Sequence, residues 1–481
     1  MQTLKHYIQV LIVPVLLAIS SHSLSQGSDI SFQRITINEG LSLSSVYQIF
    51  QDSHGFMWFA TEDGLNKYDG QNFVIYNHTP GRNNTLSHRW IEHILEDRNG
   101  QLWLGSRRGV SVLDPSTDRI YSFVHDPDDR NSISGDTTLC MYLSEDYLWV
   151  GTTTGLSRID IETFDIERME FMCGSMEQSV LTIYSDKEDR TWVGTNHGLY
   201  VSYEDKNRLE CVLTKMPDNS EPVVRSVHVS ADTLWVGTQD GLLKYILEGR
   251  NSIVFKYPVI QYLNNTSIET LFEDSRGGLW IITSNTLLKL ENGDFRELVH
   301  TDLRSPSLAV NPKKPIREDS NGIIWFGTFG DGLYELSGNG KILNHFLYDA
   351  AVSSSLSDNT ITCIYEDRGS GLWFGTFGAG INLFDPGSNL IKTLRHNAFN
   401  PESLSSSFVW SIQEDSHGKV WIGTNTTGIN VYDPVNEHYT HIVHDPDNPA
   451  SLPEGAIREI FMSSDGTIWV GTDGGGLSKF D

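Results

Sequence analysis

The sequence predicts an all-β protein, a β-propeller of four-stranded antiparallel blades. The first observation is a phrase built around one tryptophan, as in LWVGTTTGLSRID (148–160), which occurs ten times; most copies also have one glycine two residues after the tryptophan and another in the turn that follows. The second is that successive copies stand 43 to 48 residues apart. A period of this length, made of short strands, is typical of propeller blades. The repeated tryptophans are Trp58, Trp103, Trp149, Trp192, Trp235, Trp280, Trp325, Trp373, Trp421 and Trp469.

The second copy, residues 86–124, shows how one repeat folds. Its runs RWIEHILED, LWLGS, VSVLD and RIYSFV have the composition of short strands, and the turns DRNG, RRG and PSTD separate them. We expect the tryptophan to fill the space between neighbouring blades and the glycine after it to let the neighbouring chain approach. The second glycine is expected to adopt positive φ in its turn. The repeated phrase is therefore interpreted as architecture.

Composition and charge exclude some functions. The chain has 481 residues, of which 38% are hydrophobic and 20% charged, and its formal net charge is −27. A chain of this length is too long for one ordinary domain. Its strong negative charge would repel a phosphate backbone, so nucleic acid is not expected as a partner. No cofactor or metal is expected. The aspartates of linkers such as HDPDDRNSIS (125–134) lack the spacing of an EF-hand loop and are interpreted as turn residues.

The first 25 residues are interpreted as a signal peptide. Lys5 precedes the apolar run YIQVLIVPVLLAI (7–19), and Ser23 and Ser25 suit the small positions before a cleavage site. The run is shorter than the roughly 20 residues that span a bilayer, and an uncleaved anchor is the alternative. Either interpretation predicts export.

Four cysteines follow the leader: Cys140, Cys173, Cys211 and Cys363. In an oxidising compartment they could pair in three ways. Cys140 and Cys363 lie inside apolar strand patterns, which favours buried thiols at these two positions.

The copies divide into two groups. In copies one to five, two residues separate the Thr or Ser of the Trp strand from the turn glycine, whereas in copies seven to ten three residues do. The spacing also lengthens to 48 residues after Trp325. We predict a first seven-bladed propeller over residues 26–350 and the first three blades of an incomplete second propeller over 351–481; a single open ring of ten is the alternative. The strand SFQRITI (31–37) is expected to close the first ring as the outer strand of the Trp325 blade.

Ligands of propellers usually bind on one face, and the turns indicate which. Successive turns alternate between the two faces, so the Asp-x-x-Gly turns lie on one face, and the turns after the Trp strands lie on the other with the interblade linkers. Side chains that differ between copies gather on the second face. Near the start of the inner strand these are Tyr47, Glu92, Glu269, Lys314, Thr362, Trp410 and Arg458. In the Trp-strand turns they are Glu62, Asp63, Arg107, Arg108, His197, Asp240, Phe329, Phe377 and Asn425.

Aromatic faces and planar donors on this face suit sugar rings and uronic carboxylates, although drift on an exposed rim is the alternative for any single residue. The candidate ligand-binding set is Trp90, Glu92, Arg107, Arg108, His197, Asp240, Phe329, Phe377 and Trp410. The sequence has no HExxH, GxSxG or phosphate-loop motif, so we predict that this segment is not an enzyme and name no catalytic residue. A carboxylate pair for glycoside cleavage stays open as the alternative.

Several segments carry a family resemblance. GLSLSSVYQIFQDSHGFMWFATEDGLNKYDGQNF (40–73) resembles the opening blade of the two-component regulator propeller family, and HDPDNPASL and IYEDRGSGLWFGTFGAGINLFDP resemble its later blades. The resemblance covers nearly all of the chain after the leader. It implies the periplasmic sensor region of a hybrid histidine kinase of Bacteroidetes-type bacteria.

In that family two seven-bladed propellers precede a β-sandwich, a membrane helix and the kinase, and the sensed molecules are typically oligosaccharides. The resemblance therefore implies an oligosaccharide ligand, contact with a membrane only through a downstream helix, and room for a homodimer in the full receptor. The sequence departs from the plan by ending at Asp481, so we expect a truncated chain. An exported propeller-type glycosidase or lyase is the alternative function.

Overall fold

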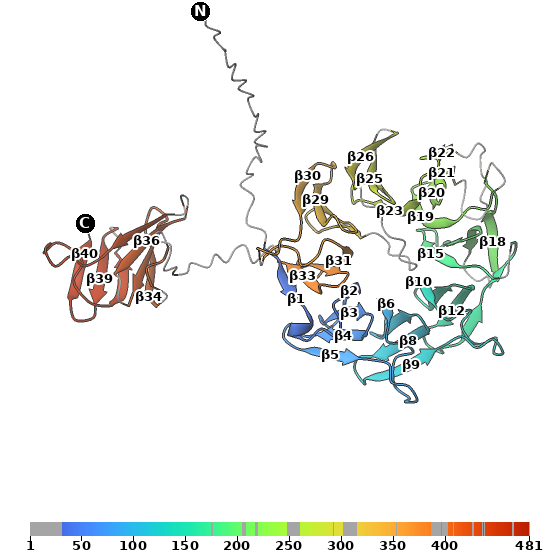
Figure 1. The fold of residues 1–481 in the computed structure, drawn as a ribbon, viewed down its shortest axis with the longest axis horizontal. Helices are drawn as coiled ribbons and strands as arrows, with labels where there is room; N and C mark the ends of the chain where they lie inside the picture. Colours follow the sequence, from blue (N-terminus) through green and yellow to red (C-terminus); the bar gives the residue numbers. More distant parts are fainter. Residues whose placement is uncertain are drawn as a thin grey trace, which may run out of the picture. The chain divides into compact units, whose positions relative to one another are not determined.

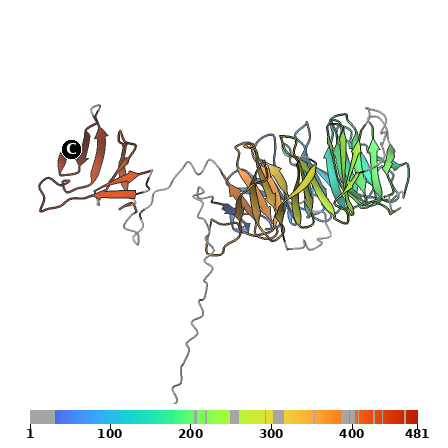
Figure 2. The same ribbon diagram turned by 90° about the horizontal axis from the view of Figure 1, so that it is seen from above.

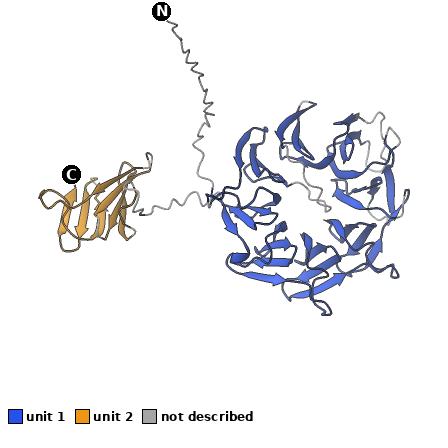
Figure 3. Cartoon of the chain, in the orientation of Figure 1, with its two compact units in different colours: residues 1–389 blue, residues 390–481 orange. Residues whose placement is uncertain are grey.

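The structure, a computed structural model, divides the chain into two compact units, residues 1–389 and 390–481 (Figure 3). It describes residues 31–174, 177–203, 208–216, 220–247, 260–291, 293–301, 315–352, 354–385, 396, 403–406, 408–425, 428–434, 436, 438–463 and 466–480. The predicted signal peptide, residues 1–25, lies outside this described part of the chain. Within it, no helix has the length and apolar character that a membrane crossing requires.

Unit 1 is a ring of antiparallel sheets, seen face-on in Figure 1 and edge-on in Figure 2. Each sheet holds one repeat of the sequence and is called a blade here. Blade 1 consists of β2 (Val46–Gln51), β3 (Met57–Thr61), β4 (Gly64–Tyr68) and β5 (Phe73–Tyr76). Blade 2 consists of β6 (Ile91–Glu96), β7 (Leu102–Ser106), β8 (Gly109–Asp114) and β9 (Arg119–Phe123). Blade 3 consists of β10 (Thr138–Leu143), β11 (Tyr147–Thr152), β12 (Leu156–Asp160) and β13 (Ile166–Arg168).

Blade 4 gains a fifth strand, because β14 (Glu170–Phe171) pairs in parallel with its outer strand. The other strands of blade 4 are β15 (Val180–Ser185), β16 (Thr191–Thr195), β17 (Gly198–Ser202) and β18 (Arg208–Leu213). Blade 5 consists of β19 (Val224–Ser230), β20 (Thr233–Thr238), β21 (Gly241–Ile246) and β22 (Ile260–Tyr262). Blade 6 consists of β23 (Ile268–Glu273), β24 (Leu279–Thr283), β25 (Thr286–Glu291) and β26 (Asp294–His300). Blade 7 consists of β27 (Ile316–Glu318), β28 (Ile323–Gly327), β29 (Leu333–Ser337) and β30 (Ile342–Phe346).

Blade 8 closes the ring by combining both ends of unit 1. Its strands β31 (Ile361–Glu366), β32 (Leu372–Thr376) and β33 (Ile381–Phe384) come from the eighth repeat, and β1 (Gln33–Ile35) pairs with β33 as the outer strand. A short 3-10 helix, η1 (Ile37–Glu39), then leads into blade 1. The inner strand β31 contacts β2 of blade 1, and the Trp373 ring lies 5.8 Å from the Phe59 ring.

The prediction that ten repeats form ten sheets is confirmed, but their division is different. The ring holds eight blades instead of seven, its unit continues to residue 389 instead of ending at 350, and a single ring of ten is also excluded. The N-terminal strand does close the ring, but on the Trp373 blade. The physical reason is that KILNHF (341–346) already fills the outer position of the Trp325 blade through β30, whereas the described part of the eighth repeat supplies only three strands.

Unit 2 contains the last two repeats. One sheet consists of β34 (Val409–Glu414), β35 (Val420–Thr424), β36 (Ile429–Asp433) and β37 (His438–Ile442). The other consists of β38 (Ile457–Met462), β39 (Ile468–Thr472) and β40 (Gly476–Phe480). Trp421 is buried between these two sheets, in a cluster with Ile457 and Ile460.

The tryptophans fill the spaces between blades, as the sequence predicts. Trp103 of blade 2, for example, packs with Leu148 and Val150 of blade 3. Every repeated tryptophan except Trp469 is buried. Burying rings of this size supplies a large share of the apolar area that holds neighbouring blades together.

The glycines have the predicted roles. A Cβ added to Gly151 would stand 2.7 Å from Val180 Cγ1, at the start of the next blade, so this glycine makes room for a neighbouring side chain. Gly109 has φ +85°, and a Cβ there would stand 2.1 Å from the carbonyl oxygen of Phe123. Only glycine fits both the left-handed backbone and the close approach at that turn.

A hydrogen bond joins the two repeated motifs of the sequence. In seven repeats of the described residues, the aspartate that starts the first hairpin turn accepts a hydrogen bond from the indole N–H of the tryptophan six residues later, and five of these turns have the sequence Asp-x-x-Gly. The pairs are Asp52–Trp58, Asp97–Trp103, Asp186–Trp192, Asp274–Trp280, Asp319–Trp325, Asp367–Trp373 and Asp415–Trp421, with distances of 2.6 to 2.9 Å. The second carboxylate oxygen accepts backbone N–H groups of the same turn. The turn aspartates are therefore structural.

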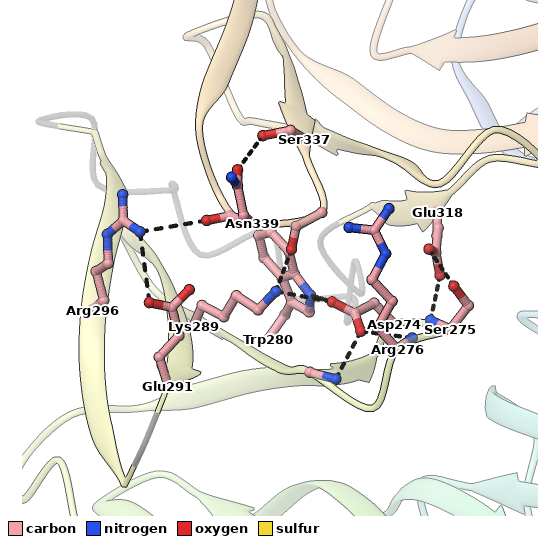
Figure 4. A network of polar contacts seen from close by, with 12 residues as sticks. Asp274, Ser275, Arg276, Trp280, Lys289, Glu291, Arg296, Glu318, Ser337 and Asn339 are labelled. Carbon is pink, nitrogen blue, oxygen red and sulfur yellow. Dashed lines mark hydrogen bonds and ion pairs between the residues drawn. The ribbon is translucent and has the colours of Figure 1, made fainter.

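Blade 6 adds a buried cation to this arrangement (Figure 4). Lys289 Nζ lies 3.1 Å from Asp274 Oδ2 and also donates to the carbonyl of Gly338 in blade 7. Burial raises the pKa of Asp274, but hydrogen bonds from Trp280, Gly278 and Lys289 outweigh it and hold that pKa below its ordinary value.

Cys173 and Cys211 form a disulfide, with their Cα atoms 6.2 Å apart. The bridge ties the chain after β14 to β18 of blade 4. Cys140 and Cys363 are not part of a disulfide. Cys140 is buried and Cys363 is partly buried, so the predicted buried thiol holds fully for Cys140. Burial raises the pKa of the Cys363 thiol to about 12, so it stays protonated at neutral pH.

Candidate functional site

A β-bulge occurs at the start of the inner strand in nine of the ten described sheets. The register of the inner strand shifts across Tyr47, Glu92, Leu139, Leu181, Arg225, Glu269, Thr362, Trp410 and Arg458. A bulge leaves its extra residue outside the pairing and can redirect that side chain. The positions at which the copies differ in sequence are therefore bulge positions.

The sequence identified six of these bulge residues, and Lys314, the candidate in blade 7, lies outside the described residues. Leu139 and Arg225 were missed because the first hairpins of blades 3 and 5 are one residue shorter, which moves the bulge from eleven to ten residues before the tryptophan. Leu181 of blade 4 keeps the ordinary spacing, and its position alone would have identified it.

The bulge residue pairs with the Trp-strand turn fifteen residues later in several blades. Tyr47 donates its hydroxyl hydrogen to Glu62, and Arg107 Nε donates to Glu92 Oε1 at 3.1 Å. In unit 2, Trp410 Nε1 donates to Asn425 Oδ1 at 3.1 Å. Arg458 pairs with Asp473 at 2.5 Å in the same way. The two sets of variable positions selected from the sequence therefore do meet.

A cavity of about 590 Å³ lies in the ring, and the Tyr47–Glu62 and Glu92–Arg107 pairs line it. Blades 1, 2, 3, 6, 7 and 8 line it, and residues of the Trp-strand turns take part, so it lies on the predicted face. Of the predicted ligand-binding residues, the cavity brings together Trp90, Glu92, Arg107, Phe329 and Phe377. Tyr47, Glu62 and Thr362, which were also singled out, line it too.

Trp90, Arg107 and Glu92 form one cluster in this cavity. The Arg107 guanidinium carbon lies 3.3 Å from the centroid of the Trp90 ring, a close cation–π contact. The Tyr47 ring is 5.5 Å from the Trp90 ring. The Glu92 side chain is only 6% exposed, whereas that of Arg107 is 32% exposed, so the carboxylate is inside and the guanidinium reaches the cavity. Phe329 and Phe377, with ring centroids 6.2 Å apart, lie on blades 7 and 8.

Electrostatics in the cluster are set by burial. Burial raises the pKa of Glu92 above its ordinary value; the Arg107 guanidinium opposes this rise, and the Glu62 carboxylate adds to it. Burial and then the hydrogen bond to Glu62 raise the pKa of Tyr47, so its hydroxyl keeps its hydrogen at neutral pH. The cluster therefore contains the Glu92–Arg107 ion pair and the neutral phenol of Tyr47.

The remaining predicted residues do not line this cavity. Arg108 is exposed at the tip of its turn. His197 Nδ1 lies 2.7 Å from Glu221 Oε2 in blade 4. Asp240 lies in the Trp-strand turn of blade 5, and none of the described residues of blades 4 and 5 lines the cavity. Trp410 belongs to unit 2, where the Arg458 guanidinium lies 4.4 Å from its ring centroid.

A second cavity, of about 840 Å³, lies on the opposite face among the turns that follow the inner strands of blades 4, 5 and 6, and residues of β27 and β31 also line it. The sequence analysis did not predict this cavity, because it interpreted the turns on this face as repeated structural elements. Its lining includes His228, whose Nε2 lies 2.5 Å from Glu273 Oε2, and Arg317. Phe272, Ile316 and Ile364 line both cavities.

The linker aspartates act within their own turns. Asp126 Oδ1 accepts the N–H of Asp128 at 2.9 Å, and Asp445 Oδ1 accepts that of Asp447 at 3.0 Å. His125 Nδ1 lies 2.8 Å from the carbonyl oxygen of Ile133. In the described ranges, no group of three or more His, Cys, Asp or Glu residues is arranged to hold a metal ion.

Comparison with known proteins identifies repeats of a known family in this chain. The model described as two component regulator propeller matches six segments, namely residues 40–63, 85–108, 262–285, 355–378, 403–426 and 451–474. The chain therefore carries two component regulator propeller repeats. Over 63 residues it is 44% identical to histidine kinase P4 of Formosa agariphila, a match that covers 13% of this chain and 5% of the relative. The chain thus matches only a small part of that curated relative.

Among solved structures, one similar chain is the extracellular domain of a putative hybrid two component system of B. thetaiotaomicron. It is 22% identical, with a TM-score of 0.44, and the match covers 94% of this chain and 71% of the other. Another is an ancestral GH74 enzyme, 13% identical with a TM-score of 0.45, where the match covers 94% of this chain and 68% of the other.

Proposed function

We propose that this chain, which carries two component regulator propeller repeats, is the ligand-sensing region of a two-component signalling receptor and binds an oligosaccharide in the ring cavity. The observation that carries the proposal is the convergence of aromatic rings and planar polar groups on one cavity of about 590 Å³. Such a volume lies within the range of small-molecule sites, which run from about 300 to 1,000 Å³.

The chemistry of the lining supports a sugar ligand. Trp90, Phe329 and Phe377 offer apolar ring faces, which complement the C–H faces of pyranose rings. Glu62 and Arg107 place charged hydrogen-bonding groups beside them, where sugar hydroxyls could be bound. Apolar faces with a few polar groups at their edges are the usual composition of a specific small-molecule site.

The proposal is tested by screening neutral and acidic oligosaccharides for binding to the 481-residue chain, first by thermal shift and then by calorimetric titration. A bound oligosaccharide should lose at least tenfold in affinity when Phe377 is changed to Ala. Trp410→Ala, which removes an exposed aromatic side chain from unit 2, is the matched control and should keep wild-type affinity. Loss of binding in the Trp410 variant alone would place the site outside the ring and contradict the proposal.

An exported carbohydrate-active enzyme is the second candidate, because Glu62 and Glu92 line the same cavity. Two carboxyl groups flanking the bond are what most glycoside hydrolases require. Here Glu62 accepts a hydrogen bond from Tyr47, and Glu92 is paired with Arg107, so we favour binding without turnover. Release of reducing ends from any bound oligosaccharide, abolished by Glu92→Gln, would establish the enzyme instead.

The proposed location is the periplasm. It rests on the signal-peptide pattern of residues 1–25. N-terminal sequencing of the protein recovered from cells should give Gln26 as the first residue. A cytosolic protein that begins at Met1 would refute export.

A further inference from the structure

We propose that the ring cavity binds an acidic sugar and that the Arg107 guanidinium, stacked on Trp90 and oriented by Glu92, binds its carboxylate. This inference rests on the proposed function, because it names the chemical class of ligand for the same site. It makes Arg107 the residue that determines specificity.

Arg107 is held as a fixed donor. Its Nε donates to the buried Glu92 carboxylate at 3.1 Å, and its planar group lies against Trp90 at 3.3 Å. These two contacts restrict the rotation of the side chain. The Nη groups remain, and among the described residues neither has a hydrogen-bond acceptor. A guanidinium that uses only Nε presents its Nη groups to the cavity that it lines.

A second donor in the cluster is also unused. Trp90 Nε1 is buried and has no hydrogen-bond partner in the described part of the chain. A buried donor without an acceptor costs about 1–3 kcal/mol, so an acceptor supplied by a ligand would relieve that cost. The tryptophan and the arginine are in direct contact, so one ligand group could lie near both.

Unused donors favour a ligand group that only accepts hydrogen bonds. A carboxylate has this property and is planar, which matches the parallel N–H bonds of a guanidinium. A hydroxyl both donates and accepts and gains less from such a site. The nearby carboxylates already accept hydrogen bonds, Glu92 from Arg107 and Glu62 from Tyr47. The Nη groups of Arg107 are therefore the positively charged groups that a ligand carboxylate would meet.

The size and lining of the cavity point to a sugar acid rather than a small free anion. Phe329 and Phe377 line the same space as Arg107 and would contact the apolar body of the ligand. A free anion such as acetate would leave those rings uncovered. A uronic acid residue within an oligosaccharide supplies both the carboxylate and a ring with an apolar face.

The experiment compares matched probes by calorimetric titration on the full chain. They are trisaccharides of uronic acid in several linkages, their carboxyl-reduced neutral counterparts, and the neutral sugars carrying a sulfate ester. We expect at least one uronide to bind tenfold or more tightly than its neutral counterpart. A sulfated sugar should bind less tightly than the uronide, because its oxygens do not lie in one plane.

Four variants identify the residue responsible. Arg107→Gln should abolish the preference for the acid, and Arg107→Lys should reduce it, because the charge remains and the planar fork is lost. Arg108→Gln changes the neighbouring, exposed arginine by the same charge and should keep the preference. The double variant Arg107→Gln, Glu92→Gln leaves no unpaired buried carboxylate, so it reports on binding even if the single variant folds poorly.

The outcomes separate the two proposals. Equal binding of acid and neutral sugars would overturn the carboxylate assignment while the oligosaccharide function stands. Equal binding of uronide and sulfated sugar would show recognition of charge alone and would also overturn it. Binding of no oligosaccharide would refute the proposed function itself. A preference that survives in the double variant would remove Arg107 from the site.

Discussion

The guanidinium of Arg34 donates a hydrogen bond to the hydroxyl of Ser355, 321 residues later, with Nη2 and Oγ 3.0 Å apart. The same guanidinium binds the carbonyl groups of Ser355 and Leu356. Arg168 of blade 3 binds the linker before its own blade in the same way, through Ser132. Arg34 therefore gives blade 8 the linker contact that Arg168 gives blade 3, although it comes from the other end of the unit.

Arg34→Ala should loosen the closure of the ring. It removes hydrogen bonds to partly buried carbonyls, so we expect a loss of about 1–3 kcal/mol in the free energy of unfolding. Amide hydrogen exchange should speed up in β1 and β33. The matched variant, Arg168→Ala, should speed up exchange only around blade 3. Equal exchange of β1 in both variants would show that Arg34 has no special part in closure.

Trp149→Ala should destabilise the ring by about 3–5 kcal/mol, because it removes a large buried ring from the space between blades 3 and 4. Chemical denaturation measures the change. Tyr121, whose surface is 46% exposed, is the control, and Tyr121→Ala should cost about 1 kcal/mol or less. Similar costs for the two changes would contradict the architectural role of the tryptophans.

Asp274→Asn should change how stability depends on pH. Hydrogen bonds hold the pKa of Asp274 below its ordinary value, so the ionised carboxylate stabilises the fold above the unfolded pKa of about 3.9. That contribution is lost as the pH falls through the lower folded pKa. The gap in melting temperature between wild type and variant should therefore be constant above about pH 5 and shrink towards pH 3. The exposed control Asp294→Asn should leave the acid limb of the curve unchanged.

Arg107→Ala should destabilise the protein more at pH 8 than at pH 5. It removes the cation that opposes the rise in the pKa of Glu92. An acid whose folded pKa is raised stabilises the fold below its unfolded pKa and loses that contribution as the pH rises through the folded value. We expect a loss of about 1–3 kcal/mol at pH 8, measured by thermal melting. Arg108→Ala should stay within about 0.5 kcal/mol at both values, and a pH-independent loss in the Arg107 variant would contradict the role of Glu92.

Much of the candidate site could be predicted because the bulge occupies a constant place in the repeat. Tyr47, Glu92 and Thr362 each stand eleven residues before their tryptophan, so alignment to the tryptophans identified them. Leu139 and Arg225 escaped that alignment because a single missing turn residue shifts the count. The Asp–Trp hydrogen bond had a signal too, the constant separation of six residues, but a spacing does not say which atoms meet.

The sequence by itself determined the blade: its four strands, its turns, its buried tryptophan and its variable position near the start of the inner strand, because these depend on residues within about 45 positions of one another. The tertiary structure alone decided how many blades close the ring. Closure depends on the pairing of Gln33–Ile35 with Ile381–Phe384. The residues of so short a strand do not specify which distant strand it pairs with. That closure brings Phe377 of blade 8 to the same cavity as Tyr47 of blade 1, and therefore decides which of the variable side chains can act on one ligand.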